Sequence, residues 1–162
     1  MDLLDRLLEH DRWTTRRVLA ICCALPPDQL MQPFDVGPGT LDATLRHLIA
    51  NIQVWTDLMR EGSVRPVDVI RSADIVELST LFEDLYAEFA ACARKVRDEG
   101  RWDATYLDTL DNPPKPKTFG GTVAHVITHD MHHRAELLHM LGRLGVEDLP
   151  EGDVLGWEAQ AS

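Results

Sequence analysis

Four long stretches of this 162-residue sequence repeat apolar side chains every three or four positions. That spacing places the apolar residues on one face of an α-helix, which needs a partner surface to cover it. The stretches are residues 3–25, 40–61, 74–99 and 119–144, to within a residue or two. Amphipathic helices without a sheet bury their apolar faces against one another. The sequence therefore predicts an all-α fold, an up-and-down four-helix bundle.

Capping and stop residues set the expected boundaries of these helices. Thr40 is a predicted N-cap, and Asp74 with Glu77 three residues later resembles a capping pair. The expected stops are Pro26-Pro27, Gly62, Gly100 and Gly145. We expect residues 63–72 to be a connector, residues 101–117 a loop with a short hairpin, and the residues after Gly145 an irregular tail.

The composition indicates one globular domain over residues 1–162, a usual domain length that needs no disulfides. Cys22, Cys23 and Cys92 are expected to be buried thiols. The net charge of −11 argues against a nucleic-acid partner. The longest apolar run, Val18 to Leu25, is too short to cross a membrane, and the first residues lack the features of a signal peptide. We therefore expect a soluble cytoplasmic protein.

Histidines are concentrated in the last predicted helix, which carries five of the seven in the chain. At about 100° per residue, His129 and His133 lie on the shoulder of the apolar arc, whereas His125, His132 and His139 point toward the opposite pole. Residues four apart are neighbours on a helix surface, so two imidazoles with this spacing can hold one metal ion. His129 and His133 therefore form half of a predicted metal site.

The third predicted ligand is His47, which also lies beside an apolar stripe, in residues 40–61. Three imidazoles suit zinc, nickel or iron(II) and leave coordination positions for water or substrate. The pattern leaves alternatives open. His132 can replace His133 through i, i+3 spacing, and His125 forms another i, i+4 pair with His129. The histidines can also be a solvated helix face, with His47 an ordinary boundary residue.

The segment from His129 to His133, with Asp130 second, has the outline of the H-E-x-x-H zinc-hydrolase helix. Aspartate stands where glutamate serves as the general base, and its shorter side chain holds a water less well. Asp130 faces the apolar arc together with Arg134, four residues later. We therefore expect Asp130 and Arg134 to form an ion pair at a contact between helices or subunits.

These residues resemble the DinB/YfiT-like family of metalloenzymes, the DinB superfamily, and the resemblance covers nearly the whole chain. It is carried by Trp13 in the first helix, by residues 39–49 and Trp55 in the second, and by residues 125–136 and 141–145 in the last. The resemblance implies a four-helix bundle, often dimeric, with zinc or nickel on the histidines that match His47, His129 and His133. Characterised relatives include thiol S-transferases that use bacillithiol or mycothiol, and a mycothiol-dependent maleylpyruvate isomerase. Asp130 departs from the family, where a small residue such as glycine is frequent.

Three functions follow as hypotheses. The first is a metal-dependent S-transferase, a cytoplasmic homodimer acting with a small-molecule thiol whose pKa the metal lowers. The second is a hydrolase in which the metal activates water, with Asp130 or Glu136 as base. The third is a metal-binding stress-response protein without enzymatic activity.

Overall fold

The computed structural model describes residues 1–161, which form seven helices and one two-stranded sheet. The four long helices are α1 (Leu3–Cys23), α3 (Leu41–Met59), α5 (Ile75–Asp98) and α6 (Phe119–Arg143). Three short helices accompany them, α2 (Pro27–Leu30), α4 (Asp68–Ser72) and α7 (Val154–Ala161). Strands β1 (Thr105–Asp108) and β2 (Lys115–Thr118) pair antiparallel. The predicted all-α fold is confirmed.

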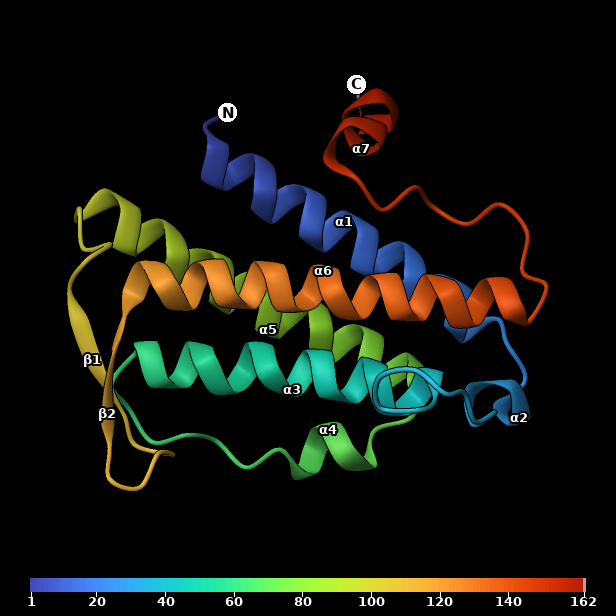
Figure 1. Cartoon of the computed structure of the whole chain (residues 1–162), viewed down its shortest axis with the longest axis horizontal. Helices are drawn as coiled ribbons and strands as arrows, with labels where there is room; N and C mark the ends of the chain where they lie inside the picture. Colours follow the sequence, from blue (N-terminus) through green and yellow to red (C-terminus); the bar gives the residue numbers. More distant parts are fainter. Residues whose placement is uncertain (162) are drawn as a thin grey trace.

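The four long helices pack as a ring in which α3 contacts both α5 and α6, and α1 contacts the same two helices from the other side. Figure 1 shows that α1 and α6 run one way, whereas α3 and α5 run the other way. α3 and α5 run in the same direction because the connector between them, residues 60–74 with α4, returns along the bundle before α5 begins (Figure 1). As a result, α6 lies antiparallel to α3.

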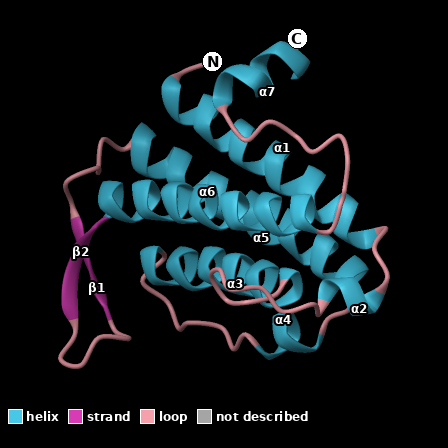
Figure 2. Ribbon diagram, turned by 45° about the vertical axis from the view of Figure 1, so that its right-hand side comes forward, coloured by secondary structure: helices cyan, strands magenta, loops and turns pink. Residues whose placement is uncertain are grey.

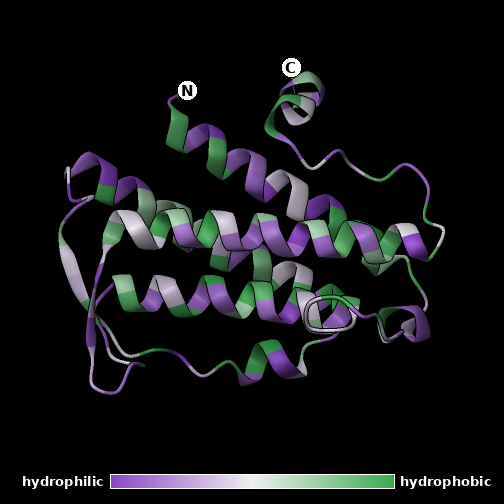
Figure 3. Ribbon diagram, viewed as in Figure 1, coloured by the Kyte–Doolittle hydropathy of each residue, from purple (hydrophilic) through white to green (hydrophobic). Residues whose placement is uncertain are grey.

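Local signals place the helix ends close to where the sequence predicts them. The Thr40 side chain accepts a hydrogen bond from the Ala43 backbone N–H at the start of α3. Asp74 and Glu77 form a reciprocal capping box at the start of α5. Figure 3 shows hydrophobic and hydrophilic residues alternating along the long helices, as amphipathic packing requires. No helix in residues 1–161 is both long and apolar enough to span a membrane.

The hairpin expected in residues 101–117 is present as β1 and β2, which project from one end of the bundle (Figure 2). The expectation of an irregular tail is wrong, because α7 forms there and packs against α1. Trp157 anchors α7 and is only 6% exposed, and His10 Nε2 lies 3.1 Å from the Gly152 carbonyl oxygen just before the helix. The short helix owes its place to these tertiary contacts, which an eight-residue pattern does not reveal.

The expected ion pair between Asp130 and Arg134 is also wrong. Both side chains are buried, but the Arg134 guanidinium contacts Asp11 of α1. The other Asp11 oxygen accepts a hydrogen bond of 2.8 Å from the Tyr86 hydroxyl. Within residues 1–161, neither Asp130 carboxylate oxygen has a hydrogen-bond partner. Tertiary packing of α1 on α6 therefore decides the pairing, over the i, i+4 spacing within α6.

Candidate metal centre

Three histidine side chains meet where the antiparallel helices α3 and α6 lie side by side. His47 Nε2 lies 3.1 Å from His129 Nε2, and His133 Nε2 lies 3.1 Å from the same atom. His129 and His133 are one turn apart on α6, and His47 faces them from the second turn of α3. The structure thus brings together the three histidines predicted from the sequence.

The chemistry of this donor set fits a bound cation. A ring nitrogen carries one proton or one lone pair in its plane, so His129 Nε2 can satisfy at most one of its two neighbours by hydrogen bonding. A cation among the three nitrogens satisfies all of them at once. Nitrogens bound tetrahedrally at about 2.0–2.1 Å from zinc lie roughly 3.3 Å apart, close to the observed spacing.

One side of the cluster is accessible. The His133 and His129 side chains are 10% and 18% exposed, whereas His47 is an exposed residue. Protein groups therefore cover the α6 side of the cluster and leave the His47 side open to solvent. An ion held there would keep positions for small molecules, as catalytic sites do.

Glu136 orients His133. One carboxylate oxygen lies 2.7 Å from His133 Nδ1, and the other lies 3.1 Å from His132 Nε2. A carboxylate accepts, so the proton of His133 is on Nδ1, and the Nε2 lone pair is left for a metal. The backbone of the 33–39 loop reaches the same carboxylate, because a Cβ added at Gly37 would collide with Glu136. Glu136 is a positioning residue that sequence spacing could have revealed at i, i+3 from His133.

Side-chain contacts link the cluster to a groove beside the hairpin. The Asn51 amide nitrogen lies 3.1 Å from His129 Nδ1, and the Asn51 oxygen accepts a hydrogen bond of 2.8 Å from Trp55 Nε1. The His125 ring is 5.2 Å from the Trp55 ring and 5.3 Å from the His129 ring. Trp55 and His125 line a cavity of about 530 Å³ with Lys117 at its edge. His125 is therefore a wall of this cavity and does not point fully away from the cluster.

The remaining sequence candidates take other places. His132 is exposed and contacts Glu136, so it does not replace His133 in the cluster of Nε2 atoms. Asp130 is completely buried, and burial raises the pKa of its carboxyl well above the usual range. Its carboxylate cannot reach a water molecule in the open groove, which argues against Asp130 as a hydrolytic base.

The fold and the cluster define an all-α bundle with a three-histidine candidate metal centre between two antiparallel helices. The DinB family model matches residues 1–156, and the chain belongs to the DinB family. A crystal structure of a DinB-like protein, YjoA from Bacillus subtilis, is similar in fold at a TM-score of 0.64 and 14% sequence identity. The match covers 91% of this chain and 96% of that one. No curated protein matches the sequence.

Replacing Glu136 by glutamine is expected to weaken zinc or nickel binding about tenfold, because carboxylates that orient a ligating histidine contribute roughly 10–100-fold to affinity. Glutamine keeps the shape but removes the charge beside His133 Nδ1. Competition with a chromophoric chelator measures the affinity. The matched control is His132→Gln, which alters the exposed partner of the same carboxylate and should change affinity less than twofold. Equal effects of both changes would contradict the assignment of Glu136.

Metal-free protein is expected to lose stability as the pH falls below about 6.5. Burial lowers the pKa of His47, His129 and His133 from 6.5, and also lowers the pKa of His10 and His125. The unfolded chain therefore binds protons before the folded chain does, and the free energy of unfolding decreases with decreasing pH. Thermal melts in EDTA between pH 7.5 and 5.5 should show the midpoint falling by several degrees.

Burial raises the pKa of Asp130, so its contribution to the free energy of unfolding changes with pH in the opposite direction. The melt series therefore needs a variant in which only the histidines differ. The triple change His47→Gln, His129→Gln, His133→Gln leaves Asp130 in place and removes three of the five shifted groups. Its midpoint should fall less over the same pH range. A fall as steep as that of the wild type would show that other groups dominate.

Proposed function

We propose that this DinB-family protein is a metal-dependent S-transferase that acts with a low-molecular-weight thiol. The observation that carries the proposal is the cluster of three histidine Nε2 atoms, which is open on the His47 side and adjoins the cavity at Trp55. An open three-histidine site suits an exchangeable ligand better than a structural ion, which proteins usually enclose with four ligands.

The protein's own cysteines are poor nucleophiles. Cys22 is fully buried, and burial raises the pKa of its thiol to about 12. Burial also raises the pKa of Cys23 and Cys92. Thiolates are the reactive form, so none of these side chains is activated at neutral pH. The attacking sulfur in the proposed reaction therefore belongs to a cosubstrate.

Each residue has a defined part in this proposal. His47, His129 and His133 would hold a zinc or nickel ion, with iron also compatible with three imidazoles. Such an ion would lower the pKa of a bound thiol and favour its thiolate form. Glu136 fixes the ring of His133, and Asn51 contacts His129. Trp55 and His125 supply the walls against which the electrophile packs.

The proposed transfer forms one sulfur–carbon bond between the thiol and the electrophile. The carbon loses its leaving group, which departs with the bonding electron pair, and the thiol proton passes to the leaving group or to solvent. No oxidant or reductant is needed. Assembly as a homodimer and a cytoplasmic location are separate predictions from the sequence.

Metal content tests the first half of the proposal. Protein purified without a histidine tag should contain about one equivalent of zinc, nickel or iron per chain, or take it up on reconstitution. Loaded and EDTA-stripped samples are then assayed with glutathione, bacillithiol, mycothiol and coenzyme A against an electrophile such as monobromobimane. Turnover that requires both metal and one of these thiols is the expected result.

The variant Cys22→Ala, Cys23→Ser, Cys92→Ser is the control, and it should keep its transfer activity. Metal binding without turnover with any thiol would favour a metal-binding protein that is not an enzyme. Turnover that survives removal of the metal would contradict the proposed mechanism.

A further inference from the structure

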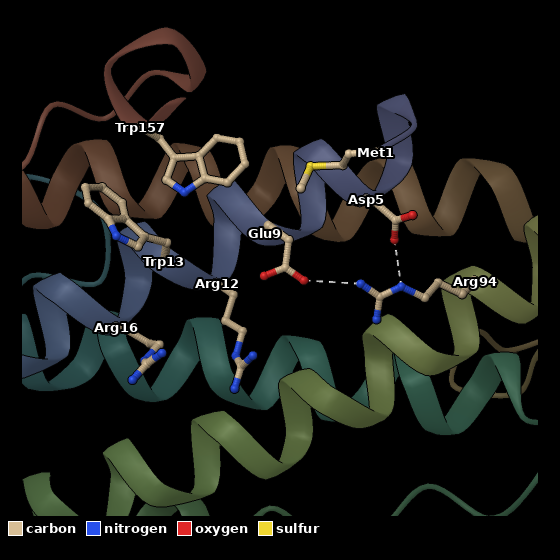
Figure 4. Close-up of a pocket in the computed structure, with 8 residues that line it drawn as sticks. All are labelled: Met1, Asp5, Glu9, Arg12, Trp13, Arg16, Arg94 and Trp157. Carbon is tan, nitrogen blue, oxygen red and sulfur yellow. Dashed lines mark hydrogen bonds and ion pairs between the residues drawn. The ribbon is translucent and has the colours of Figure 1, made fainter. Parts of the chain in front are cut away.

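A second cavity, of about 560 Å³, lies between α1, α5 and α7 and shares no lining residue with the groove at Trp55. Figure 4 shows its side chains, which come mainly from one face of α1, with Arg94 from α5 and Trp157 from α7. Two indole rings and several charged groups surround this space. None of them takes part in the candidate metal centre.

Trp157 presents an unused hydrogen-bond donor to this cavity. Trp157 is only 6% exposed, and its indole nitrogen has no hydrogen-bond acceptor within residues 1–161. Figure 4 shows this nitrogen directed inward, toward the other labelled side chains. The nitrogen is not one of the fully buried atoms without a partner, so it reaches the open space of the cavity and is available to a ligand as a donor.

Arg12 and Arg16 add further donors to the same space. They are one turn apart on α1 and share a single carboxylate, Glu83 of α5, at 2.5 Å from Arg12 Nη2 and 2.8 Å from Arg16 Nε. The Arg16 side chain contacts Glu83 through Nε and is 59% exposed. Two guanidinium groups around one carboxylate leave a local excess of positive charge in a chain whose net charge is −11.

The two acidic groups of the cavity, Asp5 and Glu9, share the Arg94 guanidinium. Asp5 lies 2.7 Å from Arg94 Nε, and Glu9 lies 3.3 Å from Arg94 Nη2. In Figure 4 Asp5 lies at the Arg94 end of the view, whereas Glu9 lies near the middle, below Trp157. The indole end of the cavity combines flat apolar walls with the hydrogen-bond donors of Arg12, Arg16 and Trp157, and Glu9 borders it.

We propose that this cavity binds a small aromatic carboxylate. Its ring packs against Trp13 and Trp157, and its carboxylate accepts hydrogen bonds from Arg16 and from the Trp157 indole N–H. Arginine is well suited to a carboxylate because its planar donors match the two oxygens. The proposal is independent of the metal centre, and metal-free protein is sufficient to test it.

The test is a titration of ¹⁵N-labelled protein with 2-naphthoate, followed by NMR. The chain has four tryptophans, so four indole N–H signals are assigned from single Trp→Phe variants. We expect saturable shifts of the Trp13 and Trp157 signals, with the Trp55 and Trp102 signals unchanged. The neutral analogue 2-naphthalenemethanol should bind about tenfold more weakly, as loss of a charged hydrogen bond predicts.

Arg16→Gln is expected to weaken 2-naphthoate binding about tenfold while the backbone spectrum stays that of a folded protein. Arg143→Gln, on α6 beside Phe34, removes the same charge at another aromatic contact and should leave binding unchanged. Trp157→Phe keeps a ring but removes the donor, and should also weaken binding. Equal binding of the neutral alcohol, stronger binding of 2-naphthylmethylamine, or shifts confined to Trp55 would each overturn the proposal.

Discussion

His129→Ala is expected to abolish metal binding, lowering the metal content from about one equivalent per chain to less than roughly a tenth. His129 Nε2 is the central atom of the cluster, 3.1 Å from the Nε2 atoms of both His47 and His133. Without it, only two of the three imidazoles that meet within the described residues remain. Elemental analysis after dialysis against metal-free buffer measures the loss.

The same helix provides matched controls for this change. His125→Ala alters a cavity wall whose ring is 5.3 Å from that of His129, and His139→Ala alters an exposed residue farther along α6. Both variants should keep their metal. Retention of metal in His129→Ala, or equal loss in His125→Ala, would refute the assignment of His47, His129 and His133 as the ligand set.

The candidate centre was largely predictable because its geometry follows from helix periodicity. His129 and His133 share a face at i, i+4, and that face borders the apolar arc that must meet another helix. The position of His47 opposite them depends on α3 and α6 being antiparallel neighbours, which the residues alone did not determine. His47 is predicted from its place beside an apolar stripe, and the resemblance to the DinB family agrees with that choice.

The features that the sequence did not reveal all depend on contacts between distant segments. The parallel course of α3 and α5 results from the path of the 60–74 connector, and α7 forms where Trp157 finds a surface on α1. The partner of Arg134 is Asp11, 123 positions away, although Asp130 has the better local spacing. Local rules predict which groups can pair, and packing selects the pair.

Arg134→Ala is expected to destabilise the fold by about 3–5 kcal/mol, the usual cost of removing one partner from a buried ion pair. Arg134 is 2% exposed, and burial lowers its pKa to about 9, so the guanidinium is still charged at neutral pH. Its removal leaves Asp11, which is fully buried, without its cation. Urea unfolding of metal-free protein at pH 7, followed by circular dichroism, measures the change.

Three further variants separate this effect from a general sensitivity to arginine loss. Arg143→Ala removes an exposed pair with Asp35 and should cost less than about 1 kcal/mol.

The double change Asp11→Leu, Arg134→Met replaces both charges with apolar groups and should recover most of the stability, because the desolvation cost of the pair disappears with it. Asp130→Asn should be neutral or stabilising, since burial already disfavours the charged form of this carboxyl, whose oxygens have no hydrogen-bond partner within residues 1–161. A double variant no more stable than Arg134→Ala would show that the guanidinium stabilises the bundle through packing or its contact with Thr15, and not through charge compensation of Asp11.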